Sequence, residues 1–205
     1  PLPSLSLGLL GLHQLLRCLS GLEGLPCFIL EHTVSTRRIT WWPLVRDDRR
    51  LRPFDFDFRL GHPEIRDAYH QQNLRAVRGT GRARQAQLFG MFDLYVPVAV
   101  TSGATLVLYA GQYLEQPLDH AALTRAFREL AGRDPGPRDP IFHRFVQACL
   151  SLPILHPEQV RGLTELGFAL KSLGEGSSLE QVQRTIERLR RRRFSPHAVD
   201  HDWVH

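Results

Sequence analysis

The stretch of sequence that decides the fold is FDLYVPVAVTSGATLVLYAG, residues 92–111. Two runs rich in valine, leucine and tyrosine lie on either side of Ser102-Gly103, and a short glycine-containing link between such runs is typical of a β-hairpin turn. Their nearly continuous apolar character indicates strands that are buried on both faces over part of their length. We therefore predict a hairpin of strands at 92–101 and 104–111 in the centre of a sheet.

The segments before this hairpin predict further extended structure. Residues 27–34 and 38–45 are rich in β-branched and aromatic side chains and lie between turn signals, as strands do. In residues 54–58 phenylalanine alternates with aspartate, which is the period of an extended segment with one apolar and one acidic face. We expect two strands and one extended segment ahead of the hairpin.

Helical spacing marks both ends of the chain and one segment between them. Leucines between residues 5 and 19 recur every three or four positions and form one apolar stripe. Pro63 occupies a favourable first-turn position of a helix that the Gly-Thr-Gly at 79–81 ends, and we expect residues 79–91 to be a loop. Beyond Pro117, periodic segments predict four helices, at 119–131, 139–151, 156–173 and 178–193.

These elements predict an α+β fold, in which helices flank an antiparallel sheet and a helical arm follows at the C-terminal end. The change of pattern after Pro117 is the natural boundary between two parts. We expect residues 1–117 to form the sheet domain with its N-terminal helix, and residues 118–205 to form the helical arm and a linker.

Composition and charge exclude several classes of protein. The formal net charge is +5, but acidic and basic residues alternate through most of the chain and only 188–193 is an arginine-rich run, which argues against direct nucleic-acid binding. The three cysteines share no CxxC spacing, so we expect neither a disulfide framework nor a zinc knuckle, and a reducing cytoplasm fits best. No apolar run reaches the ~20 residues that span a bilayer, so no membrane segment is expected.

The sequence shows no catalytic or phosphate-binding motif. No serine or cysteine stands in a strand-to-helix elbow and no phosphate loop follows a strand, so we expect neither an enzyme nor a bound cofactor. His62 and His70 are eight residues apart, about 12 Å along a helix, which is too far to share one metal ion. His197, His201 and His205 recur every four residues, but their place at the chain end favours a linker, and we expect no metal site.

Aromatic residues concentrate between positions 28 and 113 and permit two interpretations. An antiparallel sheet crossed by a helix can hold a ligand pocket that is walled by such rings and oriented by a few polar groups. Aromatic rings are also ordinary core-filling residues. If a pocket is present, we expect five rings as its walls and one amide as its polar anchor: Trp42, Phe56, Tyr69, Phe92 and Tyr95, and Gln112.

The last predicted helix leaves two interpretations open. Leu179, Val182, Ile186 and Leu189 recur at helical spacing among glutamine and arginine residues. Such a narrow apolar stripe suits the seam of a coiled-coil dimer, and it suits equally a helix that packs on its own domain. The first interpretation predicts a homodimer.

Several short motifs resemble a known family. The hairpin pairs FDLYVPV (92–98) with LVLYAGQ (106–112), and LPILHPEQV (152–160) follows downstream. An apolar strand ending in proline and a β-branched residue, a return strand ending in glycine-glutamine, and a proline before a glutamate-containing helix are similar to the sensory domain family named after PocR, the propanediol-utilisation regulator. The likeness includes an opening helix and first strand at 15–30 and covers about residues 10–173.

The resemblance implies a PAS/GAF-like fold and a cytoplasmic regulatory domain that senses a small molecule. The family is fused to DNA-binding domains, histidine kinases or cyclic-dinucleotide enzymes, so the resemblance implies that residues 118–205 lead toward an output module. Terminal helices would then transmit ligand occupancy to that module within a dimer. Because the candidate pocket is aromatic, we expect an apolar or weakly polar ligand.

The chain departs from this family in its cysteines. Family members often carry several cysteines between the second strand and the central hairpin, whereas this chain has none between Cys27 and Cys149. The resemblance therefore implies no thiol- or metal-dependent sensing. The alternative to a sensor is a protein–protein interaction module whose sheet has a solid core and whose helical arm binds a partner.

Overall fold

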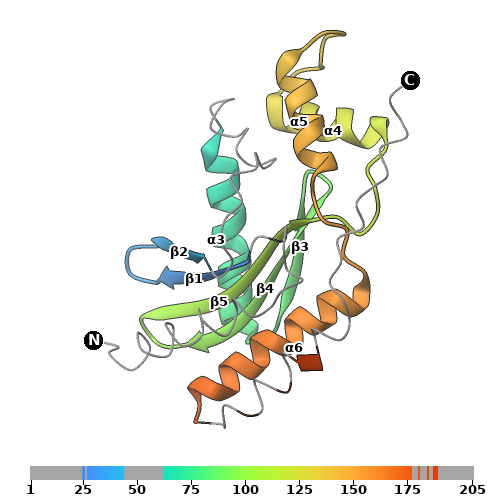
Figure 1. Cartoon of the computed structure of the whole chain (residues 1–205). Helices are drawn as coiled ribbons and strands as arrows, with labels where there is room; N and C mark the ends of the chain where they lie inside the picture. The colour runs from blue at the N-terminus through green and yellow to red at the C-terminus, as the bar shows by residue number, and fades with distance from the viewer. Residues whose placement is uncertain are drawn as a thin grey trace.

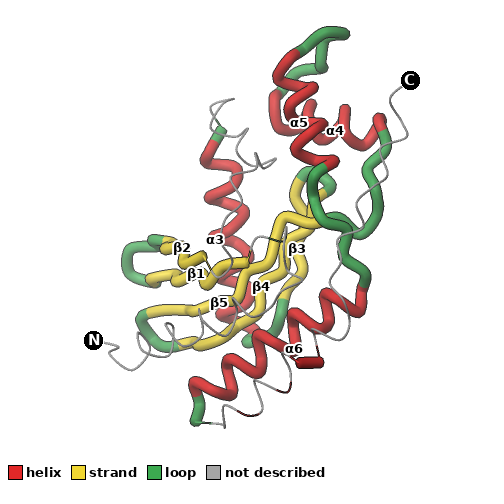
Figure 2. Tube along the Cα trace, viewed as in Figure 1, coloured by secondary structure: helices red, strands yellow, loops and turns green. Residues whose placement is uncertain are grey.

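The computed structural model describes Leu25, residues 27–43 and 62–176, and four positions further on, Glu180, Arg184, Glu187 and Arg188. Within these residues the chain forms one five-stranded antiparallel sheet with four helices (Figures 1 and 2). The predicted α+β class is confirmed. The strands are β1 (Cys27–Thr33), β2 (Ile39–Pro43), β3 (Arg84–Leu88), β4 (Met91–Val100) and β5 (Ala104–Tyr113), and the helices are α3 (Pro63–Thr80), α4 (His120–Ala131), α5 (Pro140–Leu150) and α6 (Pro157–Gly174).

The predicted central hairpin is the pair β4 and β5. The strand order is β2-β1-β5-β4-β3, so β5 is the middle strand and β4 lies directly beside it. Thr101 and Ala104 close the turn, where the Thr101 amide donates to the Ala104 carbonyl oxygen at 2.9 Å. Because neither strand is at an edge, both pair on two sides, and β5 buries nine of its ten residues and β4 six of ten. The hairpin and its central position are therefore confirmed.

The expected loop at 79–91 is wrong in its second half, because β3 runs there and pairs with β4 along the edge of the sheet. Three of its five residues are Arg84, Gln85 and Gln87, which are side chains that an exposed edge strand carries and that hide a strand in a sequence. Phe89 and Gly90 make the turn into β4, both with positive φ, 52° and 79°. Phenylalanine seldom adopts this conformation, so the turn has no recognisable sequence signal.

Helices cover both faces of the sheet, α3 one and α6 the other (Figure 1). Side chains of the central strands alternate between two apolar clusters, as the strand period requires. One cluster packs under α3 and includes Tyr95, Val107 and Tyr109. The other packs under α6 and includes Leu94, Val96, Leu106 and Leu108. Burial on both faces, expected from the apolar sequence of the hairpin, is thus confirmed.

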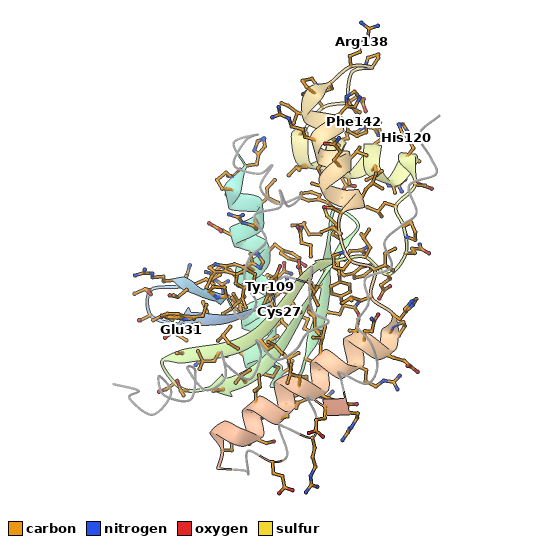
Figure 3. All side chains as sticks on the ribbon, in the orientation of Figure 1. Cys27, Glu31, Tyr109, His120, Arg138 and Phe142 are labelled. Carbon is orange, nitrogen blue, oxygen red and sulfur yellow. The ribbon has the colours of Figure 1, made fainter. Side chains whose placement is uncertain are left out.

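Helices α4 and α5 form a third apolar cluster with the end of the sheet. Met91 enters this cluster from β4 and Leu114 from the position after β5, and the rings that include Phe142, labelled in Figure 3, enter it from the helices. Asp119 and Asp139 cap the two helices, each by accepting backbone N–H groups of the first turn. The chain returns to the sheet after α5, where Leu114 exchanges backbone hydrogen bonds with residues 153 and 155 at 2.9 and 2.8 Å.

Other predictions about the chain fall partly outside the described residues. The helix expected at 5–19 and the extended segment at 54–58 lie outside them, as does most of 178–193, whose four described positions are helical. The helices expected at 119–131, 139–151 and 156–173 match α4, α5 and α6 within two residues. The division into two parts at residue 117 stays a prediction, although α6 shares its core with the sheet. None of the described helices is long and apolar enough to cross a membrane.

Candidate functional site

One carboxylate is buried in the middle of the sheet face that α3 covers. Asp93 follows two residues of β4 and has no solvent-exposed surface. Its cross-strand partner on β5 is Gly111, and a methyl group there would overlap the Asp93 carboxyl group and come within 3.0 Å of the Tyr109 hydroxyl. The missing side chain at position 111 is what leaves room for the carboxylate inside the sheet.

Asp93 accepts hydrogen bonds from two tyrosines that belong to different layers. The Tyr109 hydroxyl, on β5, donates to Oδ1 at 2.5 Å, and the Tyr69 hydroxyl, on α3, donates to Oδ2 at 2.9 Å. Tyr109, labelled in Figure 3, lies where the sheet meets α3. The carboxylate therefore joins two strands of the sheet to each other through Tyr109 and joins the sheet to the helix through Tyr69.

A second polar contact lies beside the first on the same face. Nδ1 of His70, from α3, and the Tyr95 hydroxyl, from β4, are 2.6 Å apart, and both residues are buried. The Tyr95 ring lies 6.4 Å from that of Tyr69 and 5.3 Å from that of Tyr109, centroid to centroid. We call Tyr69, His70, Asp93, Tyr95 and Tyr109 the Asp93 cluster.

The surroundings of the Asp93 cluster are aromatic on one side and polar on another. The Trp41 ring, from β2, meets the rings of His70 and Tyr109 edge-on, at centroid distances of 4.9 and 5.4 Å. On the other side Asn73 is buried, and its Oδ1 accepts a hydrogen bond from Nε of Arg84 at 2.6 Å. Arg84 therefore donates to an amide oxygen, and it does not pair with the Asp93 carboxylate.

Burial shifts the pKa values of the titratable groups in the Asp93 cluster in opposite directions, upward for the acids and downward for the histidine. Burial raises the pKa of Asp93 to about 7, although the hydrogen bonds from Tyr109 and Tyr69 oppose the shift. Burial, with a smaller contribution from Arg66, lowers the pKa of His70 to about 3. Burial and the nearby Asp93 raise the pKa values of all three tyrosines well above the usual range. At neutral pH the imidazole and the phenols are neutral, and Asp93 is the group of the cluster that titrates.

The buried carboxylate has no cation beside it among the described residues. Its pKa responds to its burial and to two neutral hydroxyl donors, and to no charged side chain. Burying an ionised carboxylate costs several kcal/mol unless a cation compensates it. For stability alone an aliphatic side chain would be favoured at this position, such as those of Leu94 and Val96 nearby on β4. A carboxylate in this setting can accept hydrogen bonds and can attract positive charge.

The structure brings together only part of the predicted pocket. Tyr69 and Tyr95 lie side by side in the Asp93 cluster. Phe92 is on the opposite face, where its ring stacks on Tyr113 at 6.0 Å within the cluster under α6. Gln112 is buried, and its Nε2 lies 3.7 Å from Sδ of Met91.

The other two predicted walls do not join this cluster in the described structure. Trp42 is 47% exposed on the edge strand β2, on the side of that strand away from Trp41. Phe56 lies outside the described residues. The residue set as a whole stays a prediction, with Tyr69 and Tyr95 as the two members that share one site.

The sequence pattern does not single out two residues of the site, Tyr109 and Asp93. Tyr109 is one aromatic residue among many, and Asp93 lies within an otherwise apolar strand. A signal was present, because Asp93 is the only charged residue in the ten residues of β4. A lone charge inside a strand that is buried on both faces needs a buried partner, and it marks a candidate site.

Other candidate chemistry is not assembled in the described part of the chain. His62 contacts Glu64 at 3.3 Å, whereas His70 faces Tyr95, and the described residues contain no group of three or more possible metal ligands. The histidines at 197, 201 and 205 lie outside the described residues. Cys149 is buried in α5, and burial raises the pKa of its thiol to about 12, which leaves it protonated and unreactive at neutral pH.

Tyr109→Phe is expected to move the titration of Asp93 to higher pH. The change removes the shorter of the two hydrogen bonds to the carboxylate and keeps the ring, so the ionised form loses more than the protonated form. Carboxyl chemical shifts of selectively labelled aspartate, followed from pH 5 to pH 9, measure the midpoint directly. A midpoint at or below that of the parent protein would contradict the assigned contact. Phe28→Leu, which changes a neighbouring ring without removing a hydroxyl, is the control.

Comparison of the chain with models of protein families, with curated protein sequences and with solved structures finds no significant match.

Proposed function

We propose that this chain is a small-molecule-sensing regulatory domain, PAS/GAF-like in architecture, whose ligand binds beneath α3 at the Asp93 cluster. The observation that carries the proposal is a buried carboxylate, ringed by tyrosines and a neutral histidine, between a helix and a sheet. Such convergent polar groups in an otherwise apolar layer are typical of binding sites.

The architecture is compatible with the proposal. The sheet runs in the order β2-β1-β5-β4-β3 with α3 across one face, and one such architecture can serve many functions, so it does not select between a sensor and an interaction module. The Asp93 cluster favours the sensor, because an interaction module needs no buried ionisable group at its centre.

The position of the Asp93 cluster provides a route by which binding moves the helix. Tyr69 and His70 belong to α3, and their partners Asp93 and Tyr95 belong to β4. A ligand that takes over either contact changes how strongly α3 is held to the sheet, and so shifts the population of its positions. The terminal helices then carry this change to an output module, in a dimer of the chain.

The test is thermal melting of the domain against a panel of small diols, aromatic compounds and amines. A ligand at 100 times its dissociation constant stabilises the native state by about 2.7 kcal/mol, which is readily measured as a rise in Tm. We expect one chemical class to raise Tm and expect Tyr95→Phe to reduce the rise, because that change removes a hydroxyl of the site and keeps the ring.

The matched control is Phe168→Ala, since Phe168 is 38% exposed on α6 at the opposite face; the rise in Tm should persist in this variant. If no compound raises Tm and the experimental structure shows a filled core, the domain is an interaction module instead. If Phe168→Ala abolishes the rise and Tyr95→Phe does not, the ligand binds at another place.

A further inference from the structure

The charge balance around Asp93 points to the kind of ligand. The titratable and charged side chains nearest to it are Tyr69 and His70 on α3, Tyr95 on β4, Tyr109 and Tyr113 on β5, and Arg84 on β3. Helix α3 also carries Glu64, Arg66, Asp67, Arg75 and Arg78, and none of these charged side chains shifts the pKa of Asp93. The phenols and the imidazole are neutral at pH 7, and the guanidinium of Arg84 donates to the neutral amide of Asn73. Among the described residues, no cation therefore pairs with an ionised Asp93.

The rings around the carboxylate suit an organic cation. The three tyrosines of the Asp93 cluster and the adjacent Trp41 form a group of rings whose neighbouring centroids are 5.3 to 6.4 Å apart. The electron-rich face of a tyrosine or tryptophan ring attracts an ammonium group, by about 0.5–2 kcal/mol for each favourable contact. A carboxylate beside several such rings therefore most strongly attracts a positively charged nitrogen that also donates hydrogen bonds.

The contact that such a nitrogen would replace is the one made by the helix. Two tyrosine hydroxyls donate to Asp93. The Tyr109 hydroxyl, within the sheet, lies 2.5 Å from Oδ1. The Tyr69 hydroxyl lies farther away, 2.9 Å from Oδ2, and the Tyr69 side chain is only partly buried. The Tyr69 hydroxyl is a neutral donor, whereas an ammonium N–H adds the attraction between two opposite charges to its hydrogen bond with the carboxylate, so it can displace the Tyr69 hydroxyl.

We propose that the ligand of this domain is a small organic ammonium ion, which binds Oδ2 of Asp93 in place of the Tyr69 hydroxyl and thereby loosens α3 from the sheet. This inference rests on the proposed function and narrows it to a ligand class. It also changes the expectation from sequence, because the rings alone indicated an apolar or weakly polar ligand and the carboxylate among them was not recognised. The carbon skeleton of the ammonium ion supplies the apolar part.

Binding of this kind is linked to pH with a definite sign. An ammonium ion needs the ionised carboxylate, and since the pKa of Asp93 is about 7, binding below pH 7 must first remove a proton. The affinity should therefore be about tenfold lower at pH 6 than at pH 8, whereas an alkylamine with a pKa near 10.4 stays charged throughout this range. A neutral ligand would show no such dependence on this group.

The experiment compares cations with their neutral counterparts. Methylammonium, n-butylammonium and phenethylammonium chlorides are titrated into the whole chain by calorimetry at pH 6 and pH 8, beside methanol, n-butanol and phenethyl alcohol, at matched ionic strength. We expect at least one ammonium ion to bind, its alcohol to bind far more weakly, and the affinity to fall about tenfold from pH 8 to pH 6. Binding of alcohol and ammonium with equal affinity, or of none of the three ammonium ions, overturns the inference.

Two variants act in opposite directions. Asp93→Asn keeps the shape and removes the charge, so ammonium binding should be lost; its folding is checked by its melting curve. Tyr69→Phe removes the competing hydroxyl, so at pH 9, where Asp93 is ionised, n-butylammonium should bind more tightly than to the parent protein. Binding that survives Asp93→Asn overturns the inference. If a neutral compound binds and Tyr95→Phe weakens it, the sensor stands and only the ligand class fails.

Discussion

Asp93→Asn is expected to raise the free energy of unfolding at pH 8 by roughly 4 kcal/mol. The pKa of Asp93 is about 7 in the folded chain against 3.8 for an unperturbed aspartate, and each pKa unit corresponds to about 1.36 kcal/mol. The folded state therefore holds the proton more tightly than the unfolded state. The stability that this provides is complete below about pH 4, falls as the pH rises, and is lost above about pH 7. Asparagine mimics the protonated acid and removes the loss.

Denaturant unfolding at pH 5, 6.5 and 8 measures this effect. The advantage of Asp93→Asn should shrink toward pH 5, because folded Asp93 is then already protonated and only the unfolded chain ionises. Asp67→Asn is the control, since Asp67 is exposed on α3, and it should leave the pH profile unchanged. If Asp93→Asn lowers stability at pH 8, the carboxylate is stabilised in its ionised form and the account of the site given above is wrong.

A buried charge that weakens its own protein needs an explanation beyond folding. The cost at neutral pH is a large fraction of the 5–15 kcal/mol that a domain of ordinary stability has. Natural sequences keep such a cost mainly where a site requires it. Under the proposed function ligand binding would provide that requirement, because an ammonium ion at Asp93 would recover the cost as affinity. The same residue would then set both the stability of the empty domain and its response.

The fold was largely predictable from local pattern. Strands β4 and β5 are marked by nearly continuous apolar runs and helices α3 to α6 by helical spacing or a first-turn proline, and all of them occur within two or three residues of the predicted limits. Strand β3 was not predictable, since its polar residues meet solvent and its pairing with β4 is decided by the strand beside it. The residues of the turn at Phe89 and Gly90 do not predict it either, because the two strands that the turn joins impose its conformation.

The site was predictable only in part, because its contacts are made across the fold. Tyr69 and Asp93 are 24 positions apart, and Tyr109 and Asp93 are 16 positions apart. No local period relates such positions. Aromatic content selects Tyr69 and Tyr95 as pocket walls, and their rings lie side by side. It also selects Phe92, which alternation along β4 places on the other face. Asp93, which accepts the hydrogen bonds of the site, is a charged residue, whereas the pattern used for prediction selects aromatic residues.

Gly167→Ala is expected to lower the free energy of unfolding by about 3 kcal/mol, because α6 lies unusually close to β4. A methyl group at position 167 would overlap Cγ1 of Val96 and come within 2.6 Å of its Cβ. Val96 is fully buried and β-branched, so it has little freedom to turn away. The helix must then lift from the sheet and open the core that the two share, and overpacking of this kind costs about 1–3 kcal/mol or more. Denaturant unfolding measures the loss.

Gly79→Ala separates this clash from the general effect of replacing a helical glycine. Gly79 is in the last turn of α3 and has no atom within 4 Å of the added methyl group, so alanine should leave stability unchanged or raise it by up to about 1 kcal/mol. Val96→Ala removes Cγ1, the closer of the two atoms in the clash, and keeps Cβ. If the close approach is the cause, Val96→Ala and Gly167→Ala together must cost less than the sum of their separate effects, since the first change removes part of the clash that the second creates. Additive losses would mean that α6 and β4 do not meet at this point, and that the layer opposite the Asp93 cluster is packed in another way.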